Sequence, residues 1–407
     1  MRSLFTDIKN LLVHKDVFLN VFVLIIWGNM LLGYMRGIVN HIPVLGDYTD
    51  AVIVLTIVIP LILALPALLS RFRVYDYFFF LVMVTAYLMN YAIHPENQEY
   101  LNENIFKCLC VATPLYFVGR ILDIEKYFRA MTLVSIMCIL MSLFYFLHYA
   151  QSAKNMAEVA GDDNMYTAYQ VLPHIVLLLW NSLRKFNILH MAATTMGVLF
   201  LLSCGTRGPL ACLAFFGMCY FLFFMNFRYA LLIKSAIIGA MGVVFMFLQE
   251  IVSYLAFTFT GLKLSTRILD KLVSGEIGND SGRTTLKVAL IHFLDTYGNI
   301  CGLGYFGSQR FGYIYAHDLI LDFQISYGYI LGSIILVMLF ALCGWAVIRC
   351  KTKMQRCFII ALISITLVKF FLSSTFLYDL YFYILLGYCC RIVFEQEQKQ
   401  QDGIQQA

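Results

Sequence analysis

The chain has 407 residues, of which 61% are hydrophobic and only 13% are charged, with a formal net charge of +5. Soluble globular domains keep about a quarter of their residues charged, so this composition excludes an ordinary water-soluble enzyme or binding domain. Apolar runs of about 20 residues recur along the sequence, which is the length of a helix that crosses a bilayer. The runs are continuous rather than alternating, as helices require. The sequence therefore predicts an all-α, polytopic integral membrane protein.

We expect about twelve membrane-spanning helices, packed as a single membrane domain over residues 1–407. Charges are spread through the opening stretch, MRSLFTDIKNLLVHKD, and no small-residue cleavage site precedes the first span, so no cleavable signal peptide is expected. The expected spans lie, in chain order, at 18–35, 50–69, 75–93, 105–121, 130–149, 166–182, 188–204, 208–226, 229–249, 317–348, 357–374 and 375–393.

Basic residues alternate between the links that join the expected spans. If the N-terminus is cytoplasmic, every inner link carries Lys or Arg, whereas the outer link HPENQEYLNEN (94–104) is acidic and 150–165 holds only Lys154. Because cytoplasmic loops are enriched in Lys and Arg, this alternation predicts that both termini lie on the cytoplasmic side.

The link between the ninth and tenth expected spans, residues 250–316, is long and basic on the predicted outer side. A long loop can be translocated regardless of its charge, or its cations can face an anionic ligand. We expect an amphipathic helix over 281–298, capped by Ser281 and lying at or in the outer interface. The next segment, 297–318, is rich in Gly and Tyr, which predicts an irregular chain packed on protein. The apolar face of the expected helix comprises Leu286, Ala289, Leu290 and Phe293.

A lone charge, Arg207, interrupts the apolar stretch LLSCGTRGPLACLAFF (201–216). Gly208 and Pro209 follow, and proline suits the first turn of a helix, so the eighth expected span begins here with its N-terminus outside. The N-terminus of a helix favours anions, and a guanidinium binds phosphate oxygens in a bidentate manner. The alternative is an arginine that extends to the lipid headgroups.

Two more polar residues stand at helix starts on the same predicted side. His317 lies at or just before the first turn of the tenth expected span, where a neutral imidazole can take a proton from a hydroxyl; the alternative is a hydrogen-bonded structural histidine. Arg283 begins the expected loop helix. With Arg207, these residues suit an anionic leaving group such as pyrophosphate and a hydroxyl nucleophile. No acidic cluster stands beside them in the sequence, which disfavours a metal-dependent mechanism.

Three blocks of sequence around these residues resemble the O-antigen ligase/polymerase superfamily of bacterial cell-envelope enzymes. They occur in the family's order and spacing between residues 200 and 335, whereas the first 200 residues share only hydropathy with it. One departure is Asp318, which stands where the family usually has asparagine. The blocks are SCGTRGPLA (203–211), GRTTLKVALIHFLDTYGNICGLGYFG (282–307) and HDLILDFQISYGYILG (317–332).

The resemblance implies a glycosyltransferase of the bacterial cytoplasmic (inner) membrane with its active site on the outer side. It would transfer a glycan from polyprenyl pyrophosphate to an acceptor hydroxyl and would need neither a nucleotide nor a metal cofactor. By resemblance, Arg207 and Arg283 bind the pyrophosphate and His317 activates the acceptor hydroxyl. Asp318 would either raise the basicity of His317 or disfavour a nearby pyrophosphate. The other candidate substrate-binding residues, whose tyrosines can instead form an interfacial belt, are Tyr305, Tyr313 and Arg310.

Three functions are open on the sequence. The first is a polymerase that joins repeat units of a surface polysaccharide such as an O-antigen, capsule or exopolysaccharide. The second is a ligase that moves a finished glycan to lipid A core or another acceptor, and the third is a lipid-oligosaccharide flippase or transporter, which would favour internal repeats and polar groups at the midplane. The expected partners are the lipid-linked donor, the acceptor and membrane lipids, with a chain-length regulator and a flippase, and no nucleic acid.

Charged residues also occur within the last expected spans. Asp322 lies one turn beyond Asp318, and Lys369 and Asp379 flank the short outer link between the last two spans. Because charges within a membrane are usually paired, we expect structural roles for these residues, with an ion pair between Lys369 and Asp379.

Overall fold

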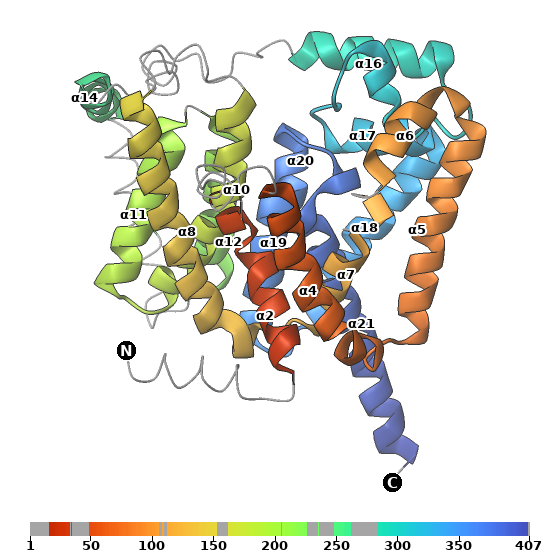
Figure 1. The fold of residues 1–407 in the computed structure, drawn as a ribbon, viewed down its shortest axis with the longest axis horizontal. Coiled ribbons are helices and arrows are strands. Elements are labelled where there is room, and N and C mark those ends of the chain that lie inside the picture. Colours follow the sequence, from red (N-terminus) through yellow and green to blue (C-terminus); the bar gives the residue numbers. More distant parts are fainter. Residues whose placement is uncertain are drawn as a thin grey trace. The chain divides into compact units, whose positions relative to one another are not determined.

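Helices make up most of the chain (Figure 1), and no β-strand occurs among the residues that the structure describes. A single isolated bridge joins Asn299 and Gly302. The predicted all-α class is therefore confirmed for this part of the chain. The structure is a computed structural model, and it describes residues 16–32, 34, 49–105, 108–109, 112–152, 162–204, 206–225, 235, 248–261 and 283–405.

The chain divides into two compact units. The first comprises residues 1–62 and 128–279, and the second comprises residues 63–127 and 280–407. The helices of the first unit are α2 (Val17–Trp27), α10 (Asp162–Arg184), α11 (Ile188–Ser203), α12 (Arg207–Phe223) and α14 (Leu248–Gly261). The unit boundaries fall within α4 (Thr49–Leu69) and α8 (Ile124–Ser152).

The second unit contains the remaining elements and carries both the helix that was predicted within the 250–316 link and the segment around His317. Its elements are α5 (Val74–Ile93), η2 (Pro95–Asn97), α6 (Gln98–Ile105), α7 (Ala112–Ile121), α16 (Arg283–Tyr297), η5 (Gly307–Phe311), α17 (Leu319–Tyr327), α18 (Tyr329–Arg349), α19 (Lys353–Ile363), the π-helical turn η6 (Ser364–Val368), α20 (Lys369–Leu372), η7 (Phe376–Tyr378) and α21 (Leu380–Gln405).

Four helices of the described residues are long and apolar enough to cross a membrane. This supports a membrane protein, whereas the predicted twelve spans, the orientation of the termini and the single domain over 1–407 stay predictions. The expected span over 229–249 lies almost wholly outside the described residues. The four candidate spans are Val74–Ile93, Ile124–Phe144, Tyr329–Arg349 and Lys353–Leu372; shorter apolar helices occur at Val17–Trp27, Leu55–Leu69, Ile188–Ser203, Arg207–Phe223 and Leu380–Phe394.

The predicted continuous span over 317–348 is wrong in one respect, because two helices, α17 and α18, meet there at Gly328. This glycine has a φ of +84°, in the left-handed region that side chains rarely adopt. A Cβ atom at Gly328 would also collide with the carbonyl oxygen of Ile300. The Gly and Tyr-rich segment therefore packs into the break, which ends α17 and starts the candidate span of α18.

A buried polar cluster lies within the helices of the first unit. The indole nitrogen of Trp27 donates to Ser135 Oγ at 3.1 Å, and the same hydroxyl lies 3.2 Å from His174 Nδ1. The Trp27 and His174 rings also meet edge to face. This cluster joins α2, α8 and α10 and fixes their rotation about their own axes.

Helices α7 and α21 of the second unit cross in close contact at two glycines (Figure 1). A Cβ atom at Gly387 would collide with the carbonyl oxygen of Tyr116, and one at Gly119 would collide with the carbonyl oxygen of Ile384. Small residues allow such close backbone approach between helices in membranes, where van der Waals packing drives association.

Gly387→Val should lower the free energy of unfolding by at least about 1–3 kcal/mol, because the added atoms overlap backbone that has nowhere to move. Gly344→Val, in the exposed middle of α18, is the matched control, since a Cβ there meets nothing within 4 Å. Thermal unfolding in detergent would separate the two variants. Equal stability would mean that α7 and α21 do not cross at these glycines.

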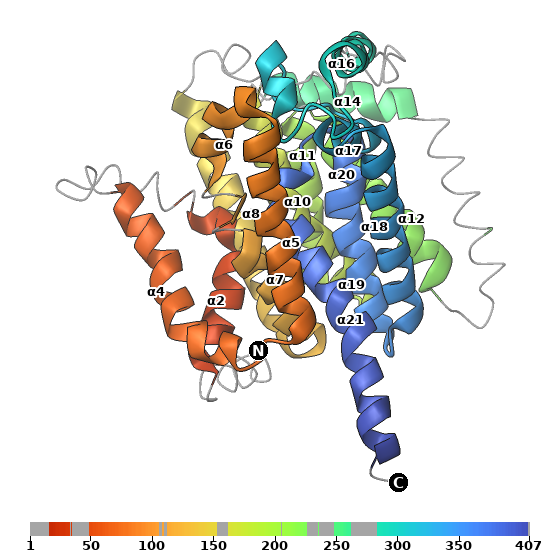
Figure 2. The ribbon, with the colours of Figure 1, turned by 90° about the vertical axis from the view of Figure 1, so that its right-hand side faces the viewer.

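The second unit has two chemically different ends. At one end, the Asp76 carboxylate near the start of α5 accepts from Arg120 Nε at 2.8 Å and from the Tyr116 hydroxyl at 2.9 Å. Asp76 and Arg120 are both buried. At the other end lie α6, α16 and the start of α17 (Figure 2). The 20-residue α5 connects the two ends and is about 30 Å long.

Candidate active site

The amphipathic loop helix is confirmed as α16, and its apolar face packs onto the segment that leads to His317. Leu290 and Leu294 are buried, and Leu286 and Phe293 are partly buried against them. Ser281, the predicted cap, lies outside the described residues, as does the whole of 262–282. The predicted 250–316 loop thus contains helical structure at α14, α16 and η5. The buried core of the cluster comprises Leu290, Leu294, Leu303, Ala316, Leu321 and Ile325.

The segment between α16 and α17 is irregular, as predicted, and glycine allows its tight approach to α17. Gly302 and Gly304 both have a φ of +80°. The N–H groups of Leu303 and Gly304 both donate to the carbonyl oxygen of Ile325, at 2.8 and 3.1 Å. A Cβ at Gly302 would overlap that same oxygen. Backbone hydrogen bonds therefore hold the segment on α17, at a close approach that only glycine allows.

Side chains from the end of α5 and from η2 hold the other side of this segment. Asn97 Nδ2 donates to the carbonyl oxygens of Leu303 and Tyr305, at 2.7 and 3.1 Å, and Asn90 Oδ1 accepts from the Tyr305 N–H at 2.7 Å. The His94 ring lies against Gly304, where a Cβ would overlap it. The link 94–104, predicted to lie on the outer side, thus holds the 297–318 segment through side-chain contacts.

Protonation of His94 at low pH should weaken these contacts, because the side chain of His94 is only 3% exposed. Burial lowers the pKa of His94 below its ordinary value of 6.5, with Glu96 opposing this shift and Arg310 adding to it. The unfolded histidine therefore binds protons first, so His94 stabilises the fold above pH 6.5 and this contribution is lost as pH falls through the lowered pKa. The protection factors of the amides of residues 302–307, which correct exchange rates for the intrinsic pH dependence of amide exchange, should fall below pH 6.5.

His94→Gln should flatten this pH dependence, because its amide does not titrate in this range. His292→Gln, on the exposed face of α16, should leave it unchanged. An identical pH profile in the wild type and His94→Gln would assign the effect to another group.

Two residues predicted to bind substrate have protein partners in the structure. Arg310 Nη1 lies 2.9 Å from Glu96 Oε1, and its guanidinium also lies over the Phe311 ring. Tyr313 packs against the cluster formed by α16 and α17. These contacts hold Arg310 and Tyr313 in place, and their contact with substrate stays a prediction.

His317 stands at the start of α17 in an unusual backbone conformation. Its φ is +53°, a left-handed value that costs a non-glycine residue about 1–2 kcal/mol. Its ring lies against the Tyr315 ring, with centroids 4.3 Å apart and planes at 49°. The next residue, Asp318, caps α17 by accepting from the N–H groups of Ile320 and Leu321, at 2.9 and 3.2 Å. The capped turn therefore fixes the backbone position of His317.

The other oxygen of Asp318 reaches across to the loop helix. Lys287 Nζ lies 2.6 Å from Asp318 Oδ2 and links α16 to the turn that carries His317. Arg283 lies four residues before Lys287, so it stands about 6 Å along the helix on the same face. Lys287 is one of the basic residues of the 250–316 link, and the sequence indicated no individual role for it. A pairing between residues 31 positions apart leaves no local pattern that predicts it.

The predicted start of α12 is confirmed, because the helix runs from Arg207 with Gly208 and Pro209 buried in its first turn. Arg207 belongs to the first unit, and Arg283 and His317 belong to the second. All three residues stand at helix starts as predicted. Their convergence in one site stays a prediction.

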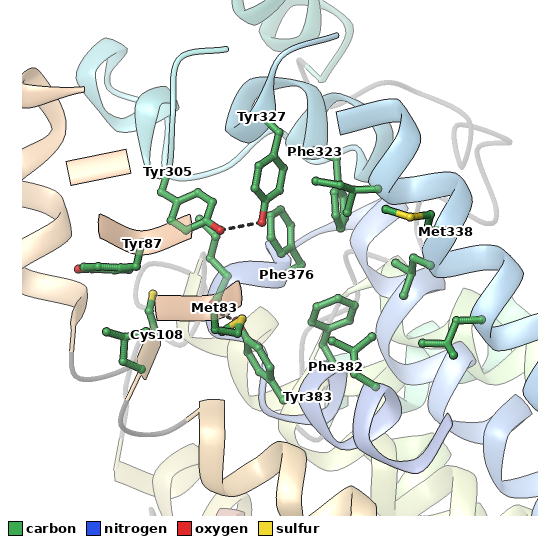
Figure 3. A pocket seen from close by; sticks show the side chains of 16 residues that line it. Met83, Tyr87, Cys108, Tyr305, Phe323, Tyr327, Met338, Phe376, Phe382 and Tyr383 are labelled. Atoms are coloured by element: carbon green, nitrogen blue, oxygen red, sulfur yellow. Dashed lines mark hydrogen bonds between the residues drawn. The ribbon is translucent and has the colours of Figure 1, made fainter. Parts of the chain in front are cut away.

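A mostly apolar cavity of about 250 Å³ lies between α5, α17, α18 and α21 in the second unit. The hydroxyls of Tyr305 and Tyr327 form a 2.7 Å hydrogen bond at its wall (Figure 3). Burial raises the pKa of Tyr305, so this hydroxyl stays neutral. Tyr305, predicted to contact glycan, thus contributes to an apolar cavity. The other cavity residues are Met83, Tyr87, Cys108, Leu109, Phe323, Ile335, Met338, Leu339, Leu342, Phe376, Leu377, Phe382, Tyr383 and Leu386.

The predicted ion pair between Lys369 and Asp379 is confirmed at 2.5 Å. Asp379 Oδ1 also accepts from the N–H groups of Tyr381 and Phe382, both at 3.1 Å, and so caps α21. The nearby Asp322 is 6% exposed and accepts hydrogen bonds from the Thr375 hydroxyl and the Phe376 N–H. These three residues therefore have the structural roles that the sequence predicted.

Comparison with family models, curated proteins and solved structures finds no match for this chain. Within the described residues, no group of three or more His, Cys, Asp or Glu side chains is arranged to hold a metal ion.

Proposed function

We propose that this chain is a membrane glycosyltransferase that polymerises repeat units carried on polyprenyl pyrophosphate into a bacterial surface polysaccharide. The observation that best supports this proposal is the Lys287–Asp318 ion pair, because it connects the basic N-terminal part of α16 to the turn that contains His317. Transfer from a pyrophosphate to a hydroxyl requires a base beside a site for the leaving anion. The sequence blocks that resemble the O-antigen ligase/polymerase superfamily include the same residues.

In the proposed reaction, the His317 imidazole takes the proton from the acceptor hydroxyl. The acceptor oxygen then bonds to the anomeric carbon of the donor sugar while the bond from that carbon to the pyrophosphate oxygen breaks. Polyprenyl pyrophosphate leaves with one added negative charge, and we assign its stabilisation to Arg207, Arg283 and Lys287. The pyrophosphate ester supplies the driving force, so the reaction requires no nucleotide.

The cavity in the second unit supports a lipid-linked donor. Its walls include Met83 and Tyr87 from α5 and Met338 from α18, and both of these helices are candidate membrane spans. The loop residue Tyr305 contributes to its wall at the end nearer α17 (Figure 3). A cavity of this character suits a segment of the polyprenyl chain, because apolar lining contributes binding free energy in proportion to the area it covers.

The test is turnover by the purified protein in vesicles, with a polyprenyl-pyrophosphate-linked oligosaccharide and no nucleotide. Longer lipid-linked glycans should form, also in the presence of EDTA. Transfer of the glycan to a core lipid instead of elongation would assign the chain to the ligase reaction. A strict need for ATP or a divalent metal, or movement of the donor across the vesicle without a new glycosidic bond, would contradict the proposal.

Lys287→Gln should raise the KM for the lipid-linked donor about tenfold or more, since a hydrogen bond to a charged group is worth about 1.5–3 kcal/mol. Asp318→Asn should lower this KM, because asparagine keeps the cap on α17 while the carboxylate that competes for Lys287 is removed. Steady-state kinetics would measure both, with the exposed Lys351→Gln as control. The KM for the donor should rise in Lys287→Gln and fall in Asp318→Asn. A change of this KM in the same direction in both variants would contradict an anion site at Lys287.

A further inference from the structure

Tyr315 connects His317 to a distant part of the chain. Its ring lies against the His317 imidazole, and its hydroxyl lies 3.0 Å from Ser373 Oγ. Ser373 is 2% exposed and follows α20, in the link that leads to α21. The orientation of Tyr315 is therefore set by a residue outside the loop that carries it.

Both ends of this connection have left-handed backbone. His317 has a φ of +53°, and Ser374, next to Ser373, has a φ of +79°. Such residues persist only where surrounding contacts hold them, and they cluster at functional sites. The Tyr315–Ser373 hydrogen bond joins residues close to these two strained positions, because Tyr315 lies two residues before His317 and Ser373 lies next to Ser374.

The link that carries Ser373 is itself held rigidly at both ends. The Lys369–Asp379 ion pair joins the residues on either side of this link. Asp322 of α17 accepts hydrogen bonds from the Thr375 hydroxyl and the Phe376 N–H within the link. The Ser373 N–H also donates to the carbonyl oxygen of Lys369 at 2.7 Å. Ser373 therefore offers Tyr315 a fixed partner.

We propose that Tyr315, hydrogen-bonded to Ser373, is a positioning residue that fixes the orientation of the His317 imidazole for proton transfer. The inference rests on the proposed role of His317 as the base. The side chain of His317 can still rotate about its own bonds after the cap on α17 has placed its Cα atom. The Tyr315 ring restricts that rotation, and Ser373 holds the Tyr315 ring.

The first test needs no turnover and measures how fast diethyl pyrocarbonate modifies His317, followed by peptide mass spectrometry. Tyr315→Phe and Ser373→Ala should each speed modification about fivefold, the factor of one typical net hydrogen bond, and the double variant should show no further increase. His292, exposed on α16, is the internal control and should keep its rate. Unchanged rates at His317, or additive effects in the double variant, would overturn the inference.

The second test measures turnover of the same variants. Each single variant and the double variant should lower kcat about fivefold with an unchanged KM for the donor and an unchanged melting temperature. Tyr329→Phe, which loses a similar hydrogen bond to Asp295, should keep wild-type kcat. A parallel loss of stability, or a change in KM alone, would overturn the positioning role. Faster modification of His317 in a protein without glycan transfer would uphold the positioning role and reject the proposed function.

Discussion

His317→Asn should lower kcat for glycan transfer by about 10²–10⁴-fold, the range expected when a general base is removed. Asparagine is the suitable replacement because it tolerates the left-handed backbone of this position, whereas alanine would add strain. The fold should therefore survive while the proton acceptor is lost. Single-turnover measurements with the lipid-linked donor would report the chemical step, with donor binding measured separately.

His292→Asn is the matched control, because it makes the same chemical change on the exposed face of α16. It should keep wild-type kcat. Arg207→Ala should lower turnover nearly as much as His317→Asn if its guanidinium stabilises the leaving pyrophosphate. Wild-type turnover in His317→Asn would assign this histidine a structural role and remove it from the mechanism.

Asp76→Ala should destabilise the protein by about 3–5 kcal/mol, because it leaves the Arg120 guanidinium buried without its carboxylate. Side chains of Asp76 and Arg120 are only 1% and 3% exposed, so water cannot replace the lost partner. The Tyr116 hydroxyl and the Arg73 N–H would lose the same acceptor. Chemical or thermal unfolding in detergent would measure the loss.

The double variant Asp76→Leu/Arg120→Leu is the informative comparison, since replacing a whole buried pair by apolar residues is often close to neutral. It should recover most of the stability that Asp76→Ala loses. Glu125→Ala, at an exposed carboxylate near the start of α8, should change stability by less than about 0.5 kcal/mol. A double variant as unstable as Asp76→Ala would show that packing around the pair, rather than its charge, dominates.

Helix starts and local pairs could be predicted from the sequence because their causes are local. Gly208 and Pro209 indicated the start of α12, and the apolar spacing around Leu290 indicated α16 within one or two residues of its observed ends. The pair between Lys369 and Asp379 was predicted because the two residues flank one short link.

Contacts between distant segments could not be predicted, and these contacts shape the candidate site. The break at Gly328 depends on the Ile300 carbonyl, which reaches it only after the loop has folded back. The Tyr315–Ser373 hydrogen bond joins residues 58 positions apart, and no periodicity in the sequence encodes it. The two-helix division of 317–348 was missed for the same reason, since hydropathy runs through Gly328 without interruption.

The most direct test of the account is an experimental structure of the His317→Asn protein with polyprenyl-pyrophosphate-linked oligosaccharide bound. We expect the pyrophosphate to lie within hydrogen-bonding distance of Arg207 and Arg283, with the side chain of residue 317 facing the anomeric carbon. A donor bound elsewhere, or Arg207 tens of ångströms from residue 317, would contradict it.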